Sequence, residues 1–317
     1  LVQPASTAMD RELAALLTDP HCNGGTLIMP NMTDIESVNC FAAITDFLVK
    51  RYTREDGKYG RIAQWIVLNE VDGGMSWANM GYRPMYVYTD YYIKVMRLVN
   101  NIVRQHDPNA ETFASFTHSW TRPALDYPAK SMMEIISTMG RNEGDYRWAL
   151  ACHSYPWDLL NPRVWEDRYA TPSMDAGCVS FLNLEVLDKW VKMPEHMYRG
   201  TEKRSVWLSE AGVNSRSYSD ADLAEQAAGT ALAWKKIAAL DGIDGLQWHN
   251  WFDNAGDGAD ARLGLRKYND EEYHGEAKPA WHIYRAAGTE DEDKAFESSL
   301  SIIGIDSWDE IMYDEIH

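Results

Sequence analysis

The chain has 317 residues, of which 45% are hydrophobic and 25% are charged. This apolar content is sufficient for a large core and argues against disorder, and no apolar run is long enough to span a bilayer. The sequence therefore predicts a soluble globular protein without a membrane partner. A formal net charge of -18 would repel phosphate backbones, which argues against nucleic acid as a partner.

The first half of the chain predicts helices and strands in alternation. Residues 33–36, TDIE, resemble a capping box with Thr33 as the cap, and they predict a helix to about Tyr52. The apolar run 61–68 predicts a buried strand that ends at Asn69-Glu70. A loop rich in Gly and Trp follows. A helix over 85–106 is then predicted from apolar residues at helical spacing: Tyr88, Tyr92, Val95, Val99 and Ile102.

The second half continues the same alternation. Strands are predicted over 111–116, 148–155, 205–209 and 243–248. Helices are predicted near 131–139, 181–192 and 220–240, the last with Asp220 as its cap. Buried parallel strands that alternate with helices define an α/β fold, and a (β/α)8 TIM-type barrel places its active site at the carboxyl ends of the strands.

The number of predicted strands is smaller than a barrel requires. Five strands are predicted from the one that ends at Glu70 onward, and only residues 26–29 and 1–3 offer others. Because a complete barrel has eight strands, we expect the chain to lack one or two N-terminal βα units, and a rearranged or open barrel is the alternative. We expect residues 1–288 to form this barrel and residues 289–317 to form an acidic C-terminal extension packed on it. The acidic run 290–293 predicts a solvated turn.

Two glutamates follow apolar strands and carry the functional prediction. Glu70 ends the strand 61–68 and Glu210 ends the strand 205–209. Retaining glycosidases need two carboxyl groups about 5–5.5 Å apart, one as general acid and base and the other as nucleophile. An ionisable group at the end of a buried strand costs free energy unless it is paired or used. The two residues together therefore predict glycosidase catalysis, whereas either one alone could be a structural carboxylate.

The strings WIVLNE (65–70) and VWLSEAG (206–212) resemble strands four and seven of the large clan of retaining glycoside hydrolases built on (β/α)8 barrels, the clan A type. This resemblance implies that Asn69 holds the sugar 2-hydroxyl, that Glu70 is the acid/base and that Glu210 is the nucleophile. It further implies that Tyr155 hydrogen-bonds the nucleophile and that Trp248 lines the innermost sugar subsite. Longer strings, MPNMT, WIVLNEVDGG, HSW and QWHNWFDN, also resemble a poorly characterised bacterial family near this clan, over most of residues 25–285.

The chain departs from the clan at two places. Val71 follows the acid/base position, where Pro is frequent, and no counterpart of the Arg on strand two is found. Other residues near the predicted strand ends are candidates for substrate binding, although each could also be a turn or core residue: Asp72, Trp77, His118, Trp120 and His153. Trp157 and Trp251 lie in loops where aromatic rings can stack on sugars, and Trp65, Trp148 and Trp234 are expected in the core.

The expected reaction is hydrolysis of a poly- or oligosaccharide by double displacement, without a cofactor or a metal. Two rival functions stay open. The first is a catalytically silent carbohydrate-binding barrel. The second is a metal-dependent hydrolase that would use His118, His153, His249 and Asp253, although these lack HxH or HExxH spacing. Residues 253–260 hint at calcium but fail the EF-hand spacing, so a flexible loop is expected there. Ser119 and Ser209 lack the G-x-S-x-G motif of a nucleophile elbow, which argues against a serine hydrolase.

The cysteines and the first residues bear on the cellular compartment. Cys22, Cys40, Cys152 and Cys178 show no CxxC spacing, which argues against a zinc site. The sequence does not decide whether Cys22 and Cys40 form a disulfide, nor whether the protein works in an oxidising compartment. The opening residues LVQP show no signal peptide. Since a mature secreted enzyme would look the same after cleavage, we expect a secreted or periplasmic protein.

Overall fold

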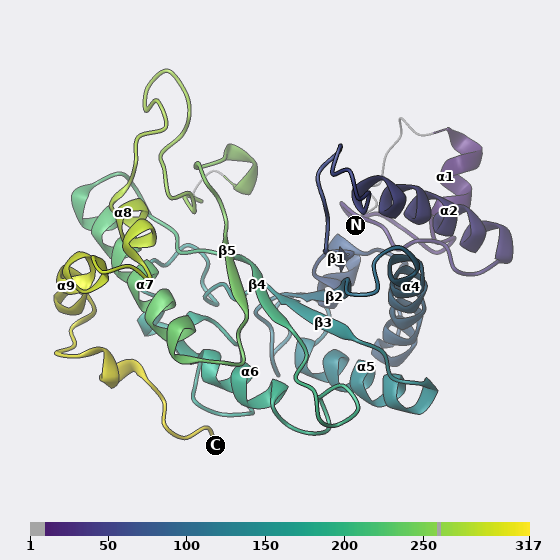
Figure 1. The fold of residues 1–317 in the computed structure, drawn as a ribbon. Helices are drawn as coiled ribbons and strands as arrows, with labels where there is room; N and C mark the ends of the chain where they lie inside the picture. Colours follow the sequence, from purple (N-terminus) through teal and green to yellow (C-terminus); the bar gives the residue numbers. More distant parts are fainter. Residues whose placement is uncertain (1–9, 259–260) are drawn as a thin grey trace. The chain divides into compact units, whose positions relative to one another are not determined.

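The computed structural model describes residues 10–258 and 261–317, and strands alternate with helices along the chain (Figure 1). The described residues form two compact units. Unit 1 comprises residues 10–119, 123–151 and 193–205, and unit 2 comprises residues 120–122, 152–192 and 206–317 without residues 259–260. Among the described residues, no helix has both the length and the hydropathy that a bilayer crossing requires.

The sheet of unit 1 consists of β1 (Gln64–Val67), β2 (Glu111–Phe116) and β3 (Trp148–Cys152), in that order. β1 pairs in parallel with β2, with Trp65 opposite Thr112. All residues of β3 are buried, as expected for a strand covered on both faces. In this unit Trp65 and Trp148 lie in the core, as predicted.

Helices cover the strands of unit 1. α4 (Met85–His106) buries all five residues of its predicted apolar face, and the Tyr92 hydroxyl donates to the Val67 carbonyl at 2.9 Å. The helices α2 (Ile35–Tyr52) and α5 (Ala129–Glu143) pack against α4. The remaining helices of the unit are short: α1 (Arg11–Leu17), η1 (Val71–Gly73) and α3 (Gly74–Trp77).

Unit 2 holds β4 (Val206–Ala211) and β5 (Gly245–Trp248), which pair in parallel with Leu208 opposite Leu246. α7 (Asp220–Ala239) packs against α8 (Pro279–Ala286) and α9 (Glu292–Ile303) around a core that includes Ala231, Ile283 and Phe296. The other helices of this unit are α6 (Leu184–Val191), η2 (Val164–Glu166), η3 (Phe181–Asn183), η4 (Ala255–Asp257) and η5 (Trp308–Ile311).

Several predicted boundaries were wrong, and each has a local cause. Asp34, not Thr33, caps α2, because the Asp34 carboxylate accepts the Ser37 N–H while the Thr33 side chain is bonded to Asn31. Ser219, not Asp220, caps α7. The strand predicted over 148–155 ends at Cys152. Residues 26–29 contribute isolated bridges rather than a strand, and the strand predicted over 1–3 lies outside the described residues.

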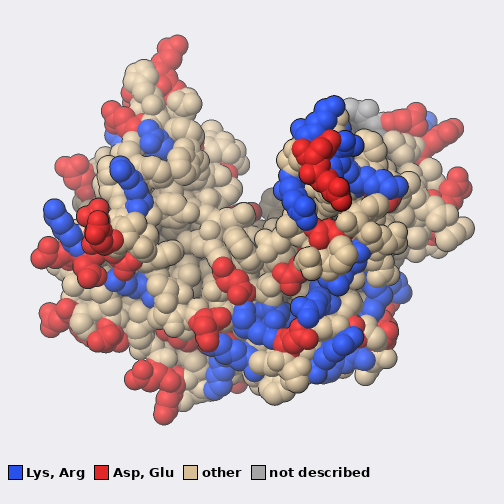
Figure 2. Space-filling model, viewed as in Figure 1, with Lys and Arg blue, Asp and Glu red and all other residues tan. Residues whose placement is uncertain are grey.

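The acidic run 290–293 is an exposed turn at Glu290 and Asp291, as predicted, but its second half begins a helix. Glu292 is the first residue of α9, and it accepts hydrogen bonds from Trp234 at 2.7 Å and Lys235 at 2.5 Å. Trp234 is accordingly half-buried against α9 rather than in the deep core. Other acidic side chains gather over α9 and the segment that follows it (Figure 2). The extension is therefore tied to α7 by buried contacts.

The chain is built like a part of a (β/α)8 barrel, with five parallel-type strands among the described residues where a complete barrel has eight. That N-terminal βα units are missing stays a prediction, and so does the division at residue 288. All four cysteines are free thiols, so the Cys22–Cys40 disulfide is absent.

Candidate active site

The backbone bends sharply where β1 ends. Leu68 and Glu70 adopt positive φ angles of 63° and 38°. Residues other than glycine seldom adopt this left-handed backbone conformation, and where they do it is often at a functional site. The Glu70 N–H donates to the Ser115 hydroxyl of β2 at 3.0 Å, which holds the turn. Asn69 and Glu70 are half-buried at the carboxyl end of β1. These positions fit the predicted roles, which stay predictions.

Asp72 lies beneath this turn and does not contact solvent. Its carboxylate is 0% exposed and accepts hydrogen bonds from the Thr117 N–H at 2.9 Å and the Thr117 hydroxyl at 2.5 Å. The pKa of Asp72 is raised to about 7, mainly by burial and to a smaller extent by the nearby Glu70 charge, while the Thr117 hydrogen bonds act in the opposite direction. These bonds fasten η1 to the end of β2, and a contact of Asp72 with substrate stays a prediction.

The other carboxylate, Glu210, lies at the end of β4 and has two polar neighbours. The Tyr155 hydroxyl donates to Glu210 Oε1 at 3.0 Å, and His153 Nδ1 lies 3.6 Å from Oε2. Tyr155 also packs edge-on against His249. His153 and Tyr155 follow β3, so the end of that strand supplies both neighbours. The hydrogen bond expected from the resemblance is therefore present, and within unit 2 it brings Glu210, His153 and Tyr155 together.

Two predicted tryptophans have structural contacts instead. Trp120 is 1% exposed, packs edge-on against Trp190 and donates its indole N–H to the Met174 carbonyl at 2.9 Å. Its role as a sugar contact stays a prediction. Trp248 stacks on Phe181 with an interplanar angle of 7°, and its indole N–H donates to a backbone carbonyl. These contacts hold the Trp248 ring in place, and its role in a sugar subsite stays a prediction.

Trp77, His118 and Trp251 keep their predicted status. Trp77 ends α3 and is half-buried, and His118 is half-buried two residues after β2. Trp251 follows β5, is 52% exposed and packs edge-on against Trp281 with the ring centroids 4.7 Å apart.

The acidic segment after β5 is not arranged as a cation site in its described part. Asp253 is buried and accepts a hydrogen bond from Lys278 Nζ at 2.8 Å, and Asp257 accepts from Asn250 at 2.5 Å. Because Lys278 occupies its carboxylate, Asp253 does not fit the metal-ligand role that the rival hydrolase would require. Asp253 and Asp257 are likewise engaged by protein donors rather than free for calcium, and residues 259–260 of this segment lie outside the described residues.

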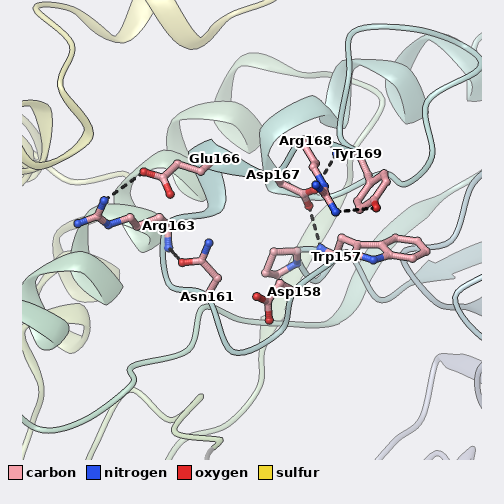
Figure 3. Close-up of a pocket in the computed structure, with 9 residues that line it drawn as sticks. Trp157, Asp158, Asn161, Arg163, Glu166, Asp167, Arg168 and Tyr169 are labelled. Carbon is pink, nitrogen blue, oxygen red and sulfur yellow. Dashed lines mark hydrogen bonds and ion pairs between the residues drawn. The ribbon is translucent and has the colours of Figure 1, made fainter.

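A pocket of about 480 Å³ opens in unit 2 directly after Tyr155 (Figure 3). It is formed by the connection between β3 and α6, and the sequence indicated only Trp157 in this region as a candidate for sugar contact. Its lining consists of Pro156, Trp157, Asp158, Asn161, Arg163, Glu166, Asp167, Arg168 and Tyr169. Sequence reasoning missed most of these residues, because an irregular connection carries no periodicity that would show which side chains converge.

The chain belongs to a protein family described as a family of unknown function, DUF5722, whose model matches residues 5–311. A search of curated proteins found no significant match. Membership of this family leaves the activity open.

Glycoside hydrolases are among the solved structures that resemble this chain. A family 39 glycoside hydrolase from Bacteroides cellulosilyticus matches with a TM-score of 0.55 and 17% identity, over 84% of this chain and 46% of that one. An endo-1,4-beta-xylanase from Penicillium canescens matches with a TM-score of 0.52 and 14% identity, over 86% and 68%. A calcium-binding mutant of a Bacteroides uniformis beta-glucuronidase matches with a TM-score of 0.51 and 12% identity, over 83% of this chain and 27% of that one.

These comparisons confirm the likeness to glycoside hydrolases at the level of the fold. The chain spans about half the length of the family 39 enzyme. Identities this low show shared architecture, and function has to be argued from the site.

Proposed function

We propose that this protein is a retaining glycoside hydrolase that cleaves a poly- or oligosaccharide. Glu210 attacks the anomeric carbon while Glu70 protonates the leaving oxygen, which forms a covalent glycosyl-enzyme. Glu70 then takes a proton from water, the water attacks the anomeric carbon, and Glu210 departs with the configuration retained. The reaction needs no cofactor.

The hydrogen bond between Tyr155 and Glu210 is the observation that carries this proposal. A nucleophilic carboxylate has to be held in one orientation so that a lone pair points at the anomeric carbon. The Tyr155 hydroxyl engages Oε1 at 3.0 Å, and His153 lies beside the other oxygen. A carboxylate in an ordinary surface ion pair would face Lys or Arg instead.

The local structure at Glu70 supports the acid/base role. Glu70 stands at the carboxyl end of a parallel strand, in a left-handed turn whose Glu70 N–H is bonded to the Ser115 hydroxyl. Carboxyl ends of parallel strands are where barrels of this class carry catalytic groups. We infer that the carboxyl groups of Glu70 and Glu210 act on one sugar ring, at the separation of about 5–5.5 Å that a retaining mechanism requires.

The comparisons supply a first choice of substrate class. One similar structure is described as an endo-1,4-beta-xylanase and another as a beta-glucuronidase. We propose a glycan chain as the substrate and xylan-derived oligosaccharides as the first to be tried.

A covalent trap tests the proposal directly. A panel of activated 2-deoxy-2-fluoro glycosides is incubated with the protein and the adducts are located by peptide mass spectrometry. We expect one sugar to label Glu210, and we expect the Glu210→Ala variant to lose turnover and labelling together.

The matched control is Glu297→Gln, an exposed carboxylate on α9, which should keep both. Labelling at another carboxylate, or full turnover by Glu210→Ala, would contradict the assignment. Binding of glycans without turnover by the native protein would favour the silent carbohydrate-binding barrel instead.

A further inference from the structure

The pocket after Tyr155 combines an aromatic wall with polar groups that face the opening. The rings of Trp157 and Tyr169 lie 4.9 Å apart between centroids, at an interplanar angle of 52° (Figure 3). The guanidinium carbon of Arg122 stands 4.8 Å from the centroid of the first ring and 4.5 Å from that of the second. Arg122 is thus within cation–π distance of both rings. Aromatic surfaces of this kind stack on the C–H faces of sugars.

Three polar side chains on the same pocket are available to a ligand. The Asn161 Oδ1 accepts the Arg163 backbone N–H at 3.2 Å, and within the described part of the chain the Asn161 amide NH₂ has no protein partner. Arg168 donates one N–H to the Tyr169 hydroxyl at 3.0 Å and forms no ion pair with any described residue. Asp158 is exposed, and one of its carboxylate oxygens accepts the backbone N–H of Leu160 at 3.2 Å. The pocket therefore offers donors and an acceptor, which is what sugar hydroxyls require.

The pocket is held rigid by bonds to the rest of unit 2. Arg163 binds Glu225 of α7 through Nε at 2.8 Å and Glu166 through Nη1 at 3.2 Å. The Asp167 carboxylate accepts the backbone N–H groups of Trp157 at 2.8 Å and of Tyr169 at 3.1 Å. A site that is ordered before binding loses little conformational entropy when the ligand arrives.

The pocket lining carries a small excess of negative charge. It holds three carboxylates, Asp158, Glu166 and Asp167, and two guanidinium groups, Arg163 and Arg168. An uncharged ligand rich in hydroxyl groups fits this lining better than a phosphate or a strongly acidic sugar, which the excess carboxylate would repel.

We propose that this pocket is a saccharide-binding subsite that takes an uncharged sugar unit of the chain whose bond Glu210 attacks. Trp157 follows Tyr155 by two residues, which limits the backbone path between them to about 7 Å, and Tyr155 contacts Glu210. The subsite and the nucleophile thus share one connection of unit 2. The claim that the subsite and Glu210 hold the same glycan rests on the proposed function. The claim that the pocket binds sugar does not. The substrate would be a chain of several sugars rather than a small glycoside.

Binding to a printed array of oligosaccharides tests this proposal, with Glu210→Gln as the background so that no ligand is hydrolysed. We expect the Glu210→Gln protein to bind neutral oligosaccharides of several units. Adding Trp157→Ala should weaken that binding about tenfold, the size expected for the loss of one aromatic contact. Adding Asn161→Ala or Arg168→Ala should weaken it as well. These two polar substitutions carry the test if Trp157→Ala does not fold.

The matched control is Phe47→Ala, an aromatic residue that is 62% exposed on α2, and it should leave the array pattern unchanged. Equal binding by the pocket variants and this control would overturn the proposal, as would an array with no bound sugar. Binding confined to acidic saccharides would overturn the uncharged class. Because the array does not depend on turnover, a failure of the proposed hydrolysis is seen separately, as the absence of fluoroglycoside labelling.

Discussion

The hydroxyl of Tyr155 donates a hydrogen bond to Oε1 of Glu210 at 3.0 Å. Tyr155 follows β3 and Glu210 lies on β4, 55 residues apart in sequence. The phenol is a weak acid with one donor, so it orients the carboxylate without neutralising its charge. Such a contact suits a carboxylate that has to be both fixed in direction and nucleophilic.

Replacing Tyr155 with Phe should therefore slow turnover while leaving the fold intact. A hydrogen bond to a charged group is worth about 1.5–3 kcal/mol, so we expect kcat to fall roughly ten- to a hundredfold, with a smaller change in KM. Steady-state kinetics on an aryl glycoside measure both constants. The surface variant Tyr86→Phe, on an exposed residue of α4, should match the native protein. An unchanged kcat in Tyr155→Phe would separate this hydrogen bond from catalysis.

Glu70 as the acid predicts a dependence on the leaving group. In Glu70→Ala, glycosides with a poor leaving group should lose about a hundredfold to ten-thousandfold in kcat, because acid catalysis contributes about 10²–10⁴-fold. Activated aryl glycosides should lose far less, since their leaving oxygen needs little protonation. Exogenous azide should restore the slowed second step and give a glycosyl azide of retained configuration. Chromatography and NMR identify that product.

The matched control is Glu143→Gln at the end of α5, whose side chain is about half exposed, and it should show native kinetics with both classes. Equal losses for good and poor leaving groups in Glu70→Ala would contradict the acid role.

Asp72 predicts how stability changes with pH. Its pKa in the folded protein is raised to about 7 from an ordinary value of 3.8, mainly by burial. The folded state therefore holds a proton that the unfolded state releases near pH 4. This contribution to stability is complete below about pH 4 and is lost as the pH rises through 7, with an upper bound of about 4 kcal/mol.

The Asp72→Asn variant cannot titrate at this position, so its free energy of unfolding should change less between pH 5 and pH 8 than that of the native protein. Urea unfolding at the two pH values measures the difference. Asp293→Asn, at an almost fully exposed carboxylate of α9, serves as the control and should follow the native pH dependence. Parallel curves for Asp72→Asn and the native protein would show that Asp72 is ionised in the folded state.

Regular elements with strong periodicity could be predicted from the sequence. α4 begins and ends at the predicted residues, because 22 residues with an apolar stripe outweigh any local alternative. The bounds of β2 were also correct. Caps shifted by one residue, since Thr33 and Asp34 are both good caps and only the contact with Asn31 decides between them.

The candidate site was predictable where a residue follows a buried strand, and not where burial depends on a distant partner. Tyr155 and Glu210 were expected to meet and do so. Asp72 was expected at the substrate because nothing near it in sequence reveals Thr117, which lies 45 residues away and buries it. The burial of Trp120 was not predicted for the same reason, because its partner Met174 is 54 residues away.

The buried pair of Lys278 and Asp253 predicts a large loss of stability on removal of one partner. Both side chains are 0% exposed, and the carboxylate also accepts from the Tyr218 hydroxyl at 2.7 Å and the Gly264 N–H at 2.8 Å. Lys278→Met leaves a buried negative charge without its cation, which should cost about 3–5 kcal/mol. The double variant with Asp253→Asn removes that charge and should recover part of the loss. Thermal unfolding of the four proteins measures the coupling, and additive losses would mean that the two charges do not stabilise each other.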